Sequence, residues 1–402
     1  MKKIIFILLL IGFSFDLSAQ TDSNISPNGI QNLWQNTSVN GYGNAFYQRD
    51  MNEEFSTVNL ERFAIFLRSK VSNKISLFSE IRMGDANIQG GLRGVSFSIE
   101  QAYLKFNLNP KNYLVAGLYL PRIGILNENH IPTTFLGNER NQVEKLILPV
   151  TWRQLGIGFY GELTNFPLTY SAGLVNGLNS EGFEHGTGIG DGRFDGLGTS
   201  ANNLAVTASL GVKKTSWNVQ VNGYYGGSVG LSPRQADSLR LNSGMFGAPV
   251  MVGEAHVQYH AKGFSATVLG TLVSIPEAAD INRAYANNTP EQEYGAYAEV
   301  GYNVLESIQK MKSRSLKLFA RYEILDVNAK IPSNGIDDGT LNQQHMVIGL
   351  NYAPSPNVAV KADVRIMNTG DENPQLVINP SPVAPPYQTQ NTFFNLGIAF
   401  SF

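Results

Sequence analysis

The sequence predicts an all-β protein, a transmembrane antiparallel β-barrel of about 16 strands with short periplasmic turns and long extracellular loops. Three features of the 402 residues predict this fold: an export signal with no later membrane-length helix, apolar and polar residues that alternate, and connections that alternate in length. Charged residues are 15% of the chain, below the roughly 25% of soluble proteins. Aromatic residues are 10%, which suits a protein with two membrane interfaces.

The N-terminus indicates export. Lys2 and Lys3 precede an apolar stretch over 4–15, and the residues 17–20 that follow it offer a small residue for signal-peptidase cleavage. This pattern predicts a signal peptide over 1–20. The apolar stretch is shorter than the ~20 residues of a spanning helix, which argues against a membrane anchor. We expect a polar lead-in over 21–40 and the barrel over 41–402.

Alternation with period two is the main structural signal from residue 41 onward. In 73–83, Ile75 and Leu77 fall on one face, and Glu80 and Arg82 fall on the other. The segments 315–325 and 358–366 repeat this pattern. A face with so many charges needs water, whereas the apolar face suits lipid or a protein core. One such segment is therefore compatible with a barrel or with a soluble β-sandwich.

The number of segments and the lengths of their connections favour the barrel. Short connections follow most even segments and long connections rich in Gly, Asn, Asp and Pro follow most odd ones, which is typical of a barrel with both termini at the short-turn rim. The predicted strands are 41–50, 57–70, 73–84, 95–108, 111–119, 151–163, 166–176, 202–213, 216–226, 249–261, 263–274, 292–305, 315–326, 343–353, 357–367 and 392–402.

The last strand carries a motif at its end. Asn395, Gly397, Phe400 and Phe402 form a pattern that resembles the C-terminal recognition strand of outer-membrane barrels. The resemblance implies that the barrel-assembly machinery reads this strand by strand pairing. It also implies location in the outer membrane of a Gram-negative bacterium, with membrane lipid around the barrel.

The region 113–124 and the later stretch 152–161, with the long polar loop between them, resemble Gram-negative porins, especially Bacteroidetes porins of the phosphate-selective porin group. This resemblance implies a homotrimeric channel whose third loop, here 120–150, folds inward and narrows the pore. A short helical turn over 138–146 with Asn138 as its cap is expected within the loop. The candidate constriction residues are Arg122, Glu128, His130, Glu139, Arg140, Glu144 and Lys145.

The charges predicted to face the lumen are nearly balanced. The basic residues are Arg62, Arg68, Lys74, Arg82, Lys105, Lys317, Arg321, Lys361 and Arg365, and the acidic residues are Glu80, Glu162, Glu254, Glu293, Glu299, Glu323 and Asp363. Balance predicts weak selectivity and passive diffusion of small hydrophilic solutes or ions. An anion- or phosphate-selective porin and a substrate-specific channel remain alternatives, and individual charges can also pair across strands to stabilise the wall.

Other classes of function find little support. The chain has no Cys, which excludes disulfides, thiolate metal sites and a Cys nucleophile, and its net charge of −2 gives no basic field for nucleic acid. His256 and His260 share a strand face with Glu254 but lie too far apart along it for one metal ion. The strand histidines face the lumen, whereas an outer-membrane lipase would present its Ser/His pair to lipid. We therefore expect no enzyme activity, cofactor or metal site, and leave calcium binding by acidic outer loops open.

Overall fold

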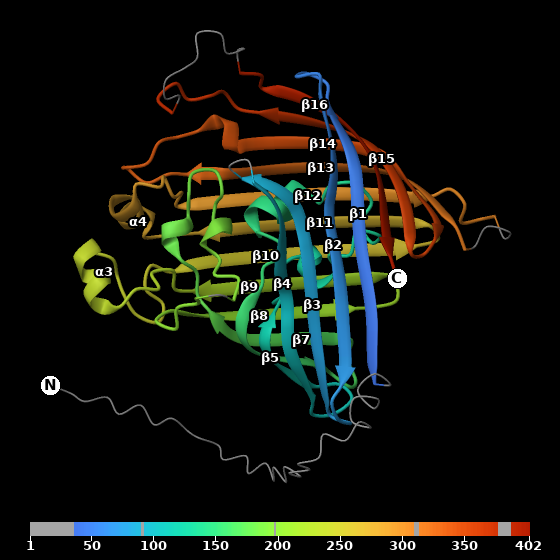
Figure 1. Cartoon of the computed structure of the whole chain (residues 1–402), viewed down its shortest axis with the longest axis horizontal. Coiled ribbons are helices and arrows are strands. Elements are labelled where there is room, and N and C mark those ends of the chain that lie inside the picture. Colours follow the sequence, from blue (N-terminus) through green and yellow to red (C-terminus); the bar gives the residue numbers. More distant parts are fainter. Residues whose placement is uncertain (1–35, 90–91, 197, 309–312, 377–386) are drawn as a thin grey trace.

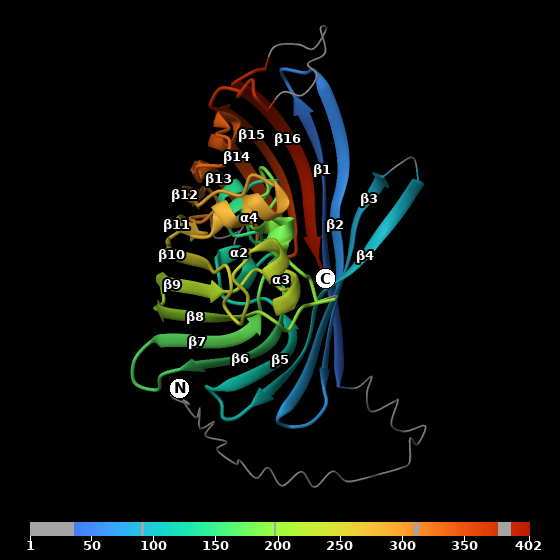
Figure 2. The ribbon, with the colours of Figure 1, turned by 90° about the vertical axis from the view of Figure 1, so that its left-hand side faces the viewer.

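The computed structural model describes residues 36–89, 92–196, 198–308, 313–376 and 387–402. These residues form a closed barrel of sixteen strands, in which each strand pairs antiparallel with its neighbours and β1 pairs with β16 (Figures 1 and 2). The strands are β1 (Thr37–Asp50), β2 (Phe55–Lys70), β3 (Ile75–Gln89), β4 (Leu92–Asn107), β5 (Tyr113–Tyr119), β6 (Gln154–Glu162), β7 (Leu168–Asn176), β8 (Leu204–Lys213), β9 (Trp217–Gly226), β10 (Val250–Ala261), β11 (Phe264–Ser274), β12 (Gln292–Asn303), β13 (Ser315–Lys330), β14 (Asn342–Ser355), β15 (Val358–Thr369) and β16 (Gln390–Ser401).

The predicted fold class and the sixteen predicted strands are confirmed, with differences at several ends. The first strand begins at Thr37, so the last part of the expected lead-in already belongs to the barrel. The sixth begins at Gln154 rather than at 151, because Thr151 and Arg153 bind other parts of the chain and end the third loop. The expected signal peptide lies outside the described residues.

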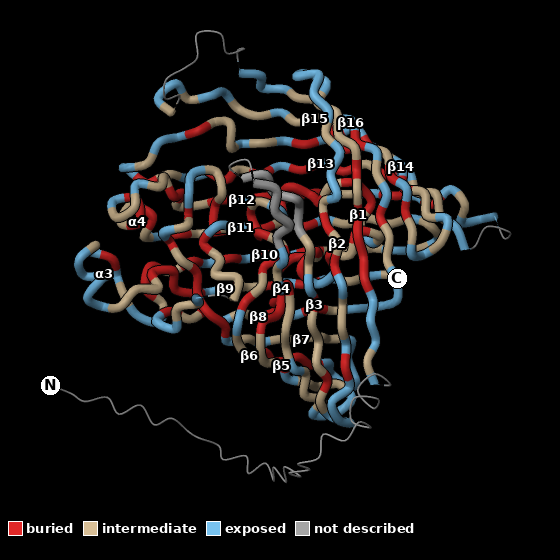
Figure 3. Tube along the Cα trace, in the orientation of Figure 1, coloured by how far each residue is buried: buried red, intermediate tan, exposed pale blue. Residues whose placement is uncertain are grey.

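The alternation along each strand separates two environments. On β13, Leu318 and Tyr322 are exposed on the outer surface, whereas Phe319, Arg321 and Glu323 are buried inside the barrel. Figure 3 shows the same change of burial from residue to residue along many strands. Because the sheet is closed, every strand finds two partners for its backbone, which a lipid environment requires. The barrel therefore has an apolar outside and an interior lined by polar and charged side chains.

Long loops occupy one rim of the barrel and pack into its mouth. The helices α3 (Pro233–Leu239) and α4 (Ala278–Tyr285) lie at this rim (Figures 1 and 2). The loops bury a shared apolar cluster that includes Leu178, Phe183, Ile189, Val229, Leu241, Ile275, Ile281 and Val327. This packing fills part of the mouth. No helix in the described residues is long and apolar enough to cross a bilayer.

Small and large side chains fit together where the barrel closes. Gly41 and Gly43 of β1 lie beneath the rings of Phe402 and Phe400, and the Phe63 ring lies 6.4 Å from that of Phe402. A Cβ atom at Gly41 would lie 2.3 Å from Cζ of Phe402 and 2.8 Å from the backbone oxygen of Ala64. Glycine is therefore required for the terminal aromatic rings to lie flat on the neighbouring strand.

We predict that Gly41→Val destabilises the barrel at its closing strands. Overpacking against a ring and a backbone oxygen costs about 1–3 kcal/mol, and the thermal unfolding midpoint of detergent-folded protein should fall accordingly. Gly253→Val is the matched control, because a Cβ atom at Gly253 meets nothing within 4 Å. Equal midpoints for the two variants would contradict the proposed role of the glycine.

Candidate pore constriction

The third loop, residues 120–153, folds into the barrel and crosses its interior. Its backbone at Gly124 donates to Glu254 of β10 at 3.3 Å, and its His130 Nε2 lies 3.0 Å from Glu80 Oε1 of β3. Farther along, the Asn138 side chain donates to Asp363 of β15 at 2.7 Å. Since these three strands lie on different sides of the barrel, the loop spans the lumen.

Wall carboxylates hold much of this loop by accepting its backbone N–H groups. Glu323 accepts from the N–H of Gln142 at 2.5 Å and of Val143 at 3.3 Å. Asp363 accepts from the backbone N–H of Asn138 at 2.8 Å. A buried segment with little regular secondary structure needs such partners for its polar backbone groups. These carboxylates therefore act as anchors rather than as free charges in the lumen.

Lys361 of β15 holds the loop by donating hydrogen bonds to its backbone carbonyl groups. Its Nζ donates to the backbone oxygens of Pro132, Phe135 and Gly137 at 2.7–2.8 Å, and the side chain is only 2% exposed. Three carbonyl acceptors satisfy the three N–H groups of an ammonium. Lys361 thus fixes the turn of the loop that lies nearest the closing strands.

The C-terminal strand also takes part in holding the loop. Asn395 donates to Asp363 at 2.8 Å and is fully buried, so it orients the carboxylate that binds Asn138. Gly397 leaves room for the loop, because a Cβ atom there would lie 2.3 Å from Oδ1 of Asn138. Two of the four residues in the predicted assembly motif therefore also have a packing role in this structure.

Two short helical segments lie within the loop, α2 (Ile125–Glu128) and the π-helix η1 (Val143–Ile147). The expected helical turn with Asn138 as its cap is wrong, because Asn138 binds Asp363 instead. The turn forms later, and Asn141 takes the capping position by accepting from the Glu144 N–H at 2.7 Å.

Glu144 joins the two helical segments to the wall. Its carboxyl group accepts from the Leu126 N–H at 2.7 Å, from the Asn141 side chain at 2.9 Å and from the Tyr297 hydroxyl of β12 at 3.1 Å. Burial raises the pKa of Glu144 to about 7, and the nearby Glu254 carboxylate acts in the same direction, although the donors oppose it. The predicted constriction residue Glu144 is thus a buried clamp.

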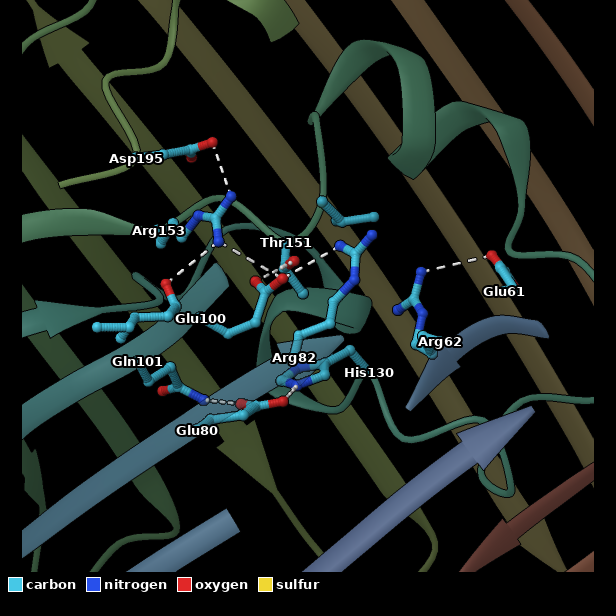
Figure 4. A network of polar contacts seen from close by, with 12 residues as sticks. Glu61, Arg62, Glu80, Arg82, Glu100, Gln101, His130, Thr151, Arg153 and Asp195 are labelled. Carbon is cyan, nitrogen blue, oxygen red and sulfur yellow. Dashed lines mark hydrogen bonds and ion pairs between the residues drawn. The ribbon is translucent and has the colours of Figure 1, made fainter. Parts of the chain in front are cut away.

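A polar network ties His130 and the C-terminal end of the loop to β3 and β4. Glu80 accepts from the Tyr42 hydroxyl at 2.5 Å and from Gln101 at 2.8 Å. Figure 4 shows Arg82, Arg153 and Thr151 converging on Glu100, and the Arg153 guanidinium also donates to Asp195 at 2.7 Å.

The charge pattern of the sequence did not identify Glu61 and Glu100 as interior residues. Both sit beside β-bulges, one where Arg62 and Leu60 face successive residues of β1 and one where Gln101 and Ile99 face successive residues of β3. A bulge inserts a residue and resets the alternation, so a period-two reading assigns the extra side chain to the wrong face.

Three cavities flank the loop inside the barrel. The loop-side cavity, of about 310 Å³, lies toward the long-loop rim and is lined by Phe46, Asn59, Glu61, Arg62, Arg82, Glu139, Arg140 and Lys145. The aromatic turn-side cavity, of about 300 Å³, includes Phe66, Tyr103, Tyr113, Tyr119, Tyr160, Arg122, Glu128 and His130. The polar turn-side cavity, of about 280 Å³, includes Gln258, His260, Tyr297, Glu299, Lys317 and Arg321.

Most of the predicted residues fall into two groups. Those that line one of these cavities are Arg62, Arg82, Arg122, Glu128, Glu139, Arg140, Lys145, Glu299, Lys317 and Arg321, while Glu80, Glu144, Glu254, Glu323, Lys361 and Asp363 hold the loop and His130 does both. Arg365 pairs with Glu139 at 2.9 Å. Arg68 and Lys105 lie closer to the short-turn rim, each over an aromatic ring.

The histidine and aspartate candidates for metal binding have protein partners. His256 Nδ1 lies 2.8 Å from Glu254, and the outer-loop residue Asp338 lies 2.8 Å from His185. The described residues contain no group of three or more acidic or histidine side chains arranged to hold a metal ion.

The barrel is similar to solved structures of outer-membrane proteins. Salmonella typhi OmpF aligns with a TM-score of 0.55 at 12% identity, over 91% of this chain and 97% of OmpF. The chain has the porin fold. The trimer form of Vibrio cholerae OmpT and an anion-selective porin from Comamonas acidovorans align with TM-scores of 0.51 at 11% and 10% identity, each over 91% of this chain and 99% of the other.

The amino-acid sequence is similar to fewer known proteins than the fold is. No family model matches the chain. An uncharacterized protein of Aquifex aeolicus is 29% identical over 347 residues, which cover 83% of this chain and 76% of that protein. The porin fold is therefore recognised from the structure, at 10–12% sequence identity to these solved structures.

We predict that Glu144 makes the folded protein less stable as the pH rises. A carboxyl group whose pKa is raised on folding contributes stability below its unfolded pKa of about 4.5, and this contribution is lost as the pH rises through about 7. The thermal midpoint should therefore fall between pH 5 and pH 8 by about 2–4 °C for each kcal/mol lost.

Glu144→Gln is the matched variant, because it keeps the shape and cannot ionise. Its midpoint should fall less over the same range, and the difference between the two proteins isolates Glu144 from other groups that titrate there. Parallel pH profiles would show that Glu144 does not titrate in this range.

Proposed function

We propose that the protein is an outer-membrane porin that lets small hydrophilic solutes and ions diffuse passively. The observation that carries this proposal is the arrangement of charged cavities on both sides of a loop that crosses a closed, polar-lined barrel. A barrel of sixteen strands is wide unless something folds into it, and here the third loop does so. The porin fold of the solved neighbours supports the same function.

The third loop should limit the conductance. Deleting residues 126–146 removes the segment that crosses the lumen and should raise single-channel conductance in planar bilayers severalfold. Deleting 233–239, which comprises the rim helix α3, is the matched control and should leave conductance nearly unchanged. Equal conductance in both variants and the native protein would place the constriction elsewhere, and a native protein without channels would refute the porin function.

A preference for anions is the second proposal, and the loop-side cavity favours it. Its lining holds four basic side chains, Arg62, Arg82, Arg140 and Lys145, against the carboxylates of Glu61 and Glu139. Arg62 and Arg140 are 7% and 6% exposed. Among the described residues, the Nε atoms of Arg62, Arg82 and Arg140 and the Nη2 atom of Arg140 are buried and have no hydrogen-bond partner. Buried guanidinium groups with free donors favour an oxyanion or halide beside them.

The local charge around the cavities supports this preference, although the charges of the whole sequence are nearly balanced. Glu80, Glu254, Glu323 and Asp363 are all at most 4% exposed and are occupied by the loop or its neighbours. The remaining basic groups equal or outnumber the carboxylates in the lining of each of the three cavities. Likeness to an anion-selective porin agrees with this preference, and a closer relation to the phosphate-selective group remains part of the proposal.

Removing the two buried arginines should reduce the preference for anions. In a KCl gradient, Arg62→Gln with Arg140→Gln should shift the reversal potential toward cation permeation, and the shift should shrink near 1 M salt, where the Debye length is about 3 Å. The matched control is Lys213→Gln with Lys214→Gln, which removes the same charge from exposed positions at the end of β8. Equal shifts in both pairs would indicate a general effect of net charge instead of a site.

The proposal includes a homotrimer in the outer membrane, inserted by the barrel-assembly machinery. The trimer form of Vibrio cholerae OmpT supports the oligomer by likeness of fold. The exposed apolar side chains around the barrel support contact with lipid, and Phe402, 57% exposed at the short-turn rim, supports recognition of the last strand.

A further inference from the structure

On the short-turn side of the third loop, four side chains form one stack: Lys105, Tyr113 and Tyr160 from the barrel wall and Arg122 from the start of the loop. Lys105 Nζ of β4 lies 3.8 Å from the centre of the Tyr113 ring, and the Tyr113 and Tyr160 rings stack at 5.1 Å with an angle of 3° between their planes. The guanidinium carbon of Arg122 lies 5.1 Å from the centre of the Tyr160 ring. Lys105 therefore lies over the Tyr113 ring, and Arg122 lies near the Tyr160 ring and within hydrogen-bonding reach of the Tyr113 side chain.

The strand register builds the stack. Tyr113 of β5 and Tyr160 of β6 are direct cross-strand partners, so their rings lie side by side on the lumen face. Tyr119 packs edge-on against Tyr160 at 6.4 Å, and its hydroxyl donates to the Ile157 carbonyl at 3.1 Å. The tyrosines are thus fixed by the sheet and by each other, and they give the long Lys and Arg side chains a rigid surface.

A second, shorter stack stands beside the first. Arg68 of β2 lies 5.4 Å from the Phe78 ring, which stacks on Tyr103 at 5.1 Å. In the described part of the chain, neither Arg68 nor Lys105 has a carboxylate within ion-pair distance. This side of the barrel therefore repeats one arrangement, in which a cation is held by a ring.

Arg122 is only weakly paired with acid. Its Nε atom lies 3.5 Å from Glu128, whose other oxygen accepts from Gln220 of β9. An aromatic face attracts a cation without cancelling its charge, whereas a carboxylate cancels it. A cation held by a ring therefore keeps its full charge toward a solute in the lumen.

We propose that Tyr113 and Tyr160 are positioning residues that hold Lys105 and the weakly paired Arg122 toward the lumen, and that these two cations form a second anion step on the short-turn side of the loop. This inference rests on the proposed porin function. An anion that leaves the loop-side cavity then meets Arg122 next to the aromatic turn-side cavity, followed by Lys105 nearer the rim. The step suits small inorganic anions such as chloride, because the two tyrosine rings stack on each other and Lys105 lies over Tyr113, which leaves little free ring face for a solute.

The test compares the loss of the aromatic rings with the loss of the tyrosine hydroxyl groups alone. Tyr113→Leu with Tyr160→Leu removes the aromatic faces, while Tyr113→Phe with Tyr160→Phe keeps them and is the matched control. In a KCl gradient, the chloride-to-potassium permeability ratio should fall about two- to fivefold in the Leu pair, which corresponds to a cation–ring interaction of about 0.5–1 kcal/mol. The Phe pair should keep the ratio of the native protein.

Several outcomes would overturn the inference. An unchanged ratio in a conducting Leu pair would show that the rings do not position the cations. An equal loss of the permeability ratio in the Phe pair would assign the effect to the hydroxyl groups. A neutral sugar that blocks the native channel and the Phe pair but not the Leu pair would show that the rings stack against solutes.

A further pair of variants covers the case in which the Leu pair does not fold. Lys105→Met and Arg122→Met should each lower the permeability ratio in an otherwise native chain, and the inference fails if neither does. A native protein that forms no channel would refute the porin function itself, which is a different result from a channel with unchanged selectivity.

Discussion

Hydrogen bonds between charged wall residues and the backbone of the third loop are the interactions on which the interior of this barrel depends. The loop crosses the lumen with little regular secondary structure, so its buried N–H and C=O groups need partners from the wall. Glu323 and Asp363 supply acceptors, and Lys361 supplies three donors. The position of the loop then determines where the cavities lie and which side chains reach them.

The closing strands serve two purposes at once. On the lipid side, Phe400 and Phe402 cover the glycines of β1 and join the ends of the barrel. On the lumen side of the same strand, Asn395 orients Asp363 and Gly397 leaves space for Asn138. Strand alternation makes this division possible, because neighbouring residues of β16 point to opposite faces. A motif expected to serve assembly thus also stabilises the constriction.

Selectivity in such a lumen depends on how each charge is partnered, and the total charge is a poor guide to it. Buried carboxylates that accept backbone N–H groups contribute little field to the wet part of the pore, although they enter any count of acidic residues. Cations held against aromatic rings keep their charge available. The proposed preference for anions rests on the unpaired donors of the loop-side arginines and on the two cations beside Tyr113 and Tyr160.

The sequence by itself determined the sixteen strands, the outward face of several of them and the alternation of short and long connections, because a closed sheet with lipid outside and water inside favours a period of two along its strands. It also singled out the third loop, by length and by resemblance. Only the tertiary structure decided that Glu144 is a clamp, that Asn138 binds Asp363 and that Glu61 and Glu100 enter the lumen at bulges. These features depend on contacts between residues far apart in the chain, and on one-residue shifts that a local pattern does not encode.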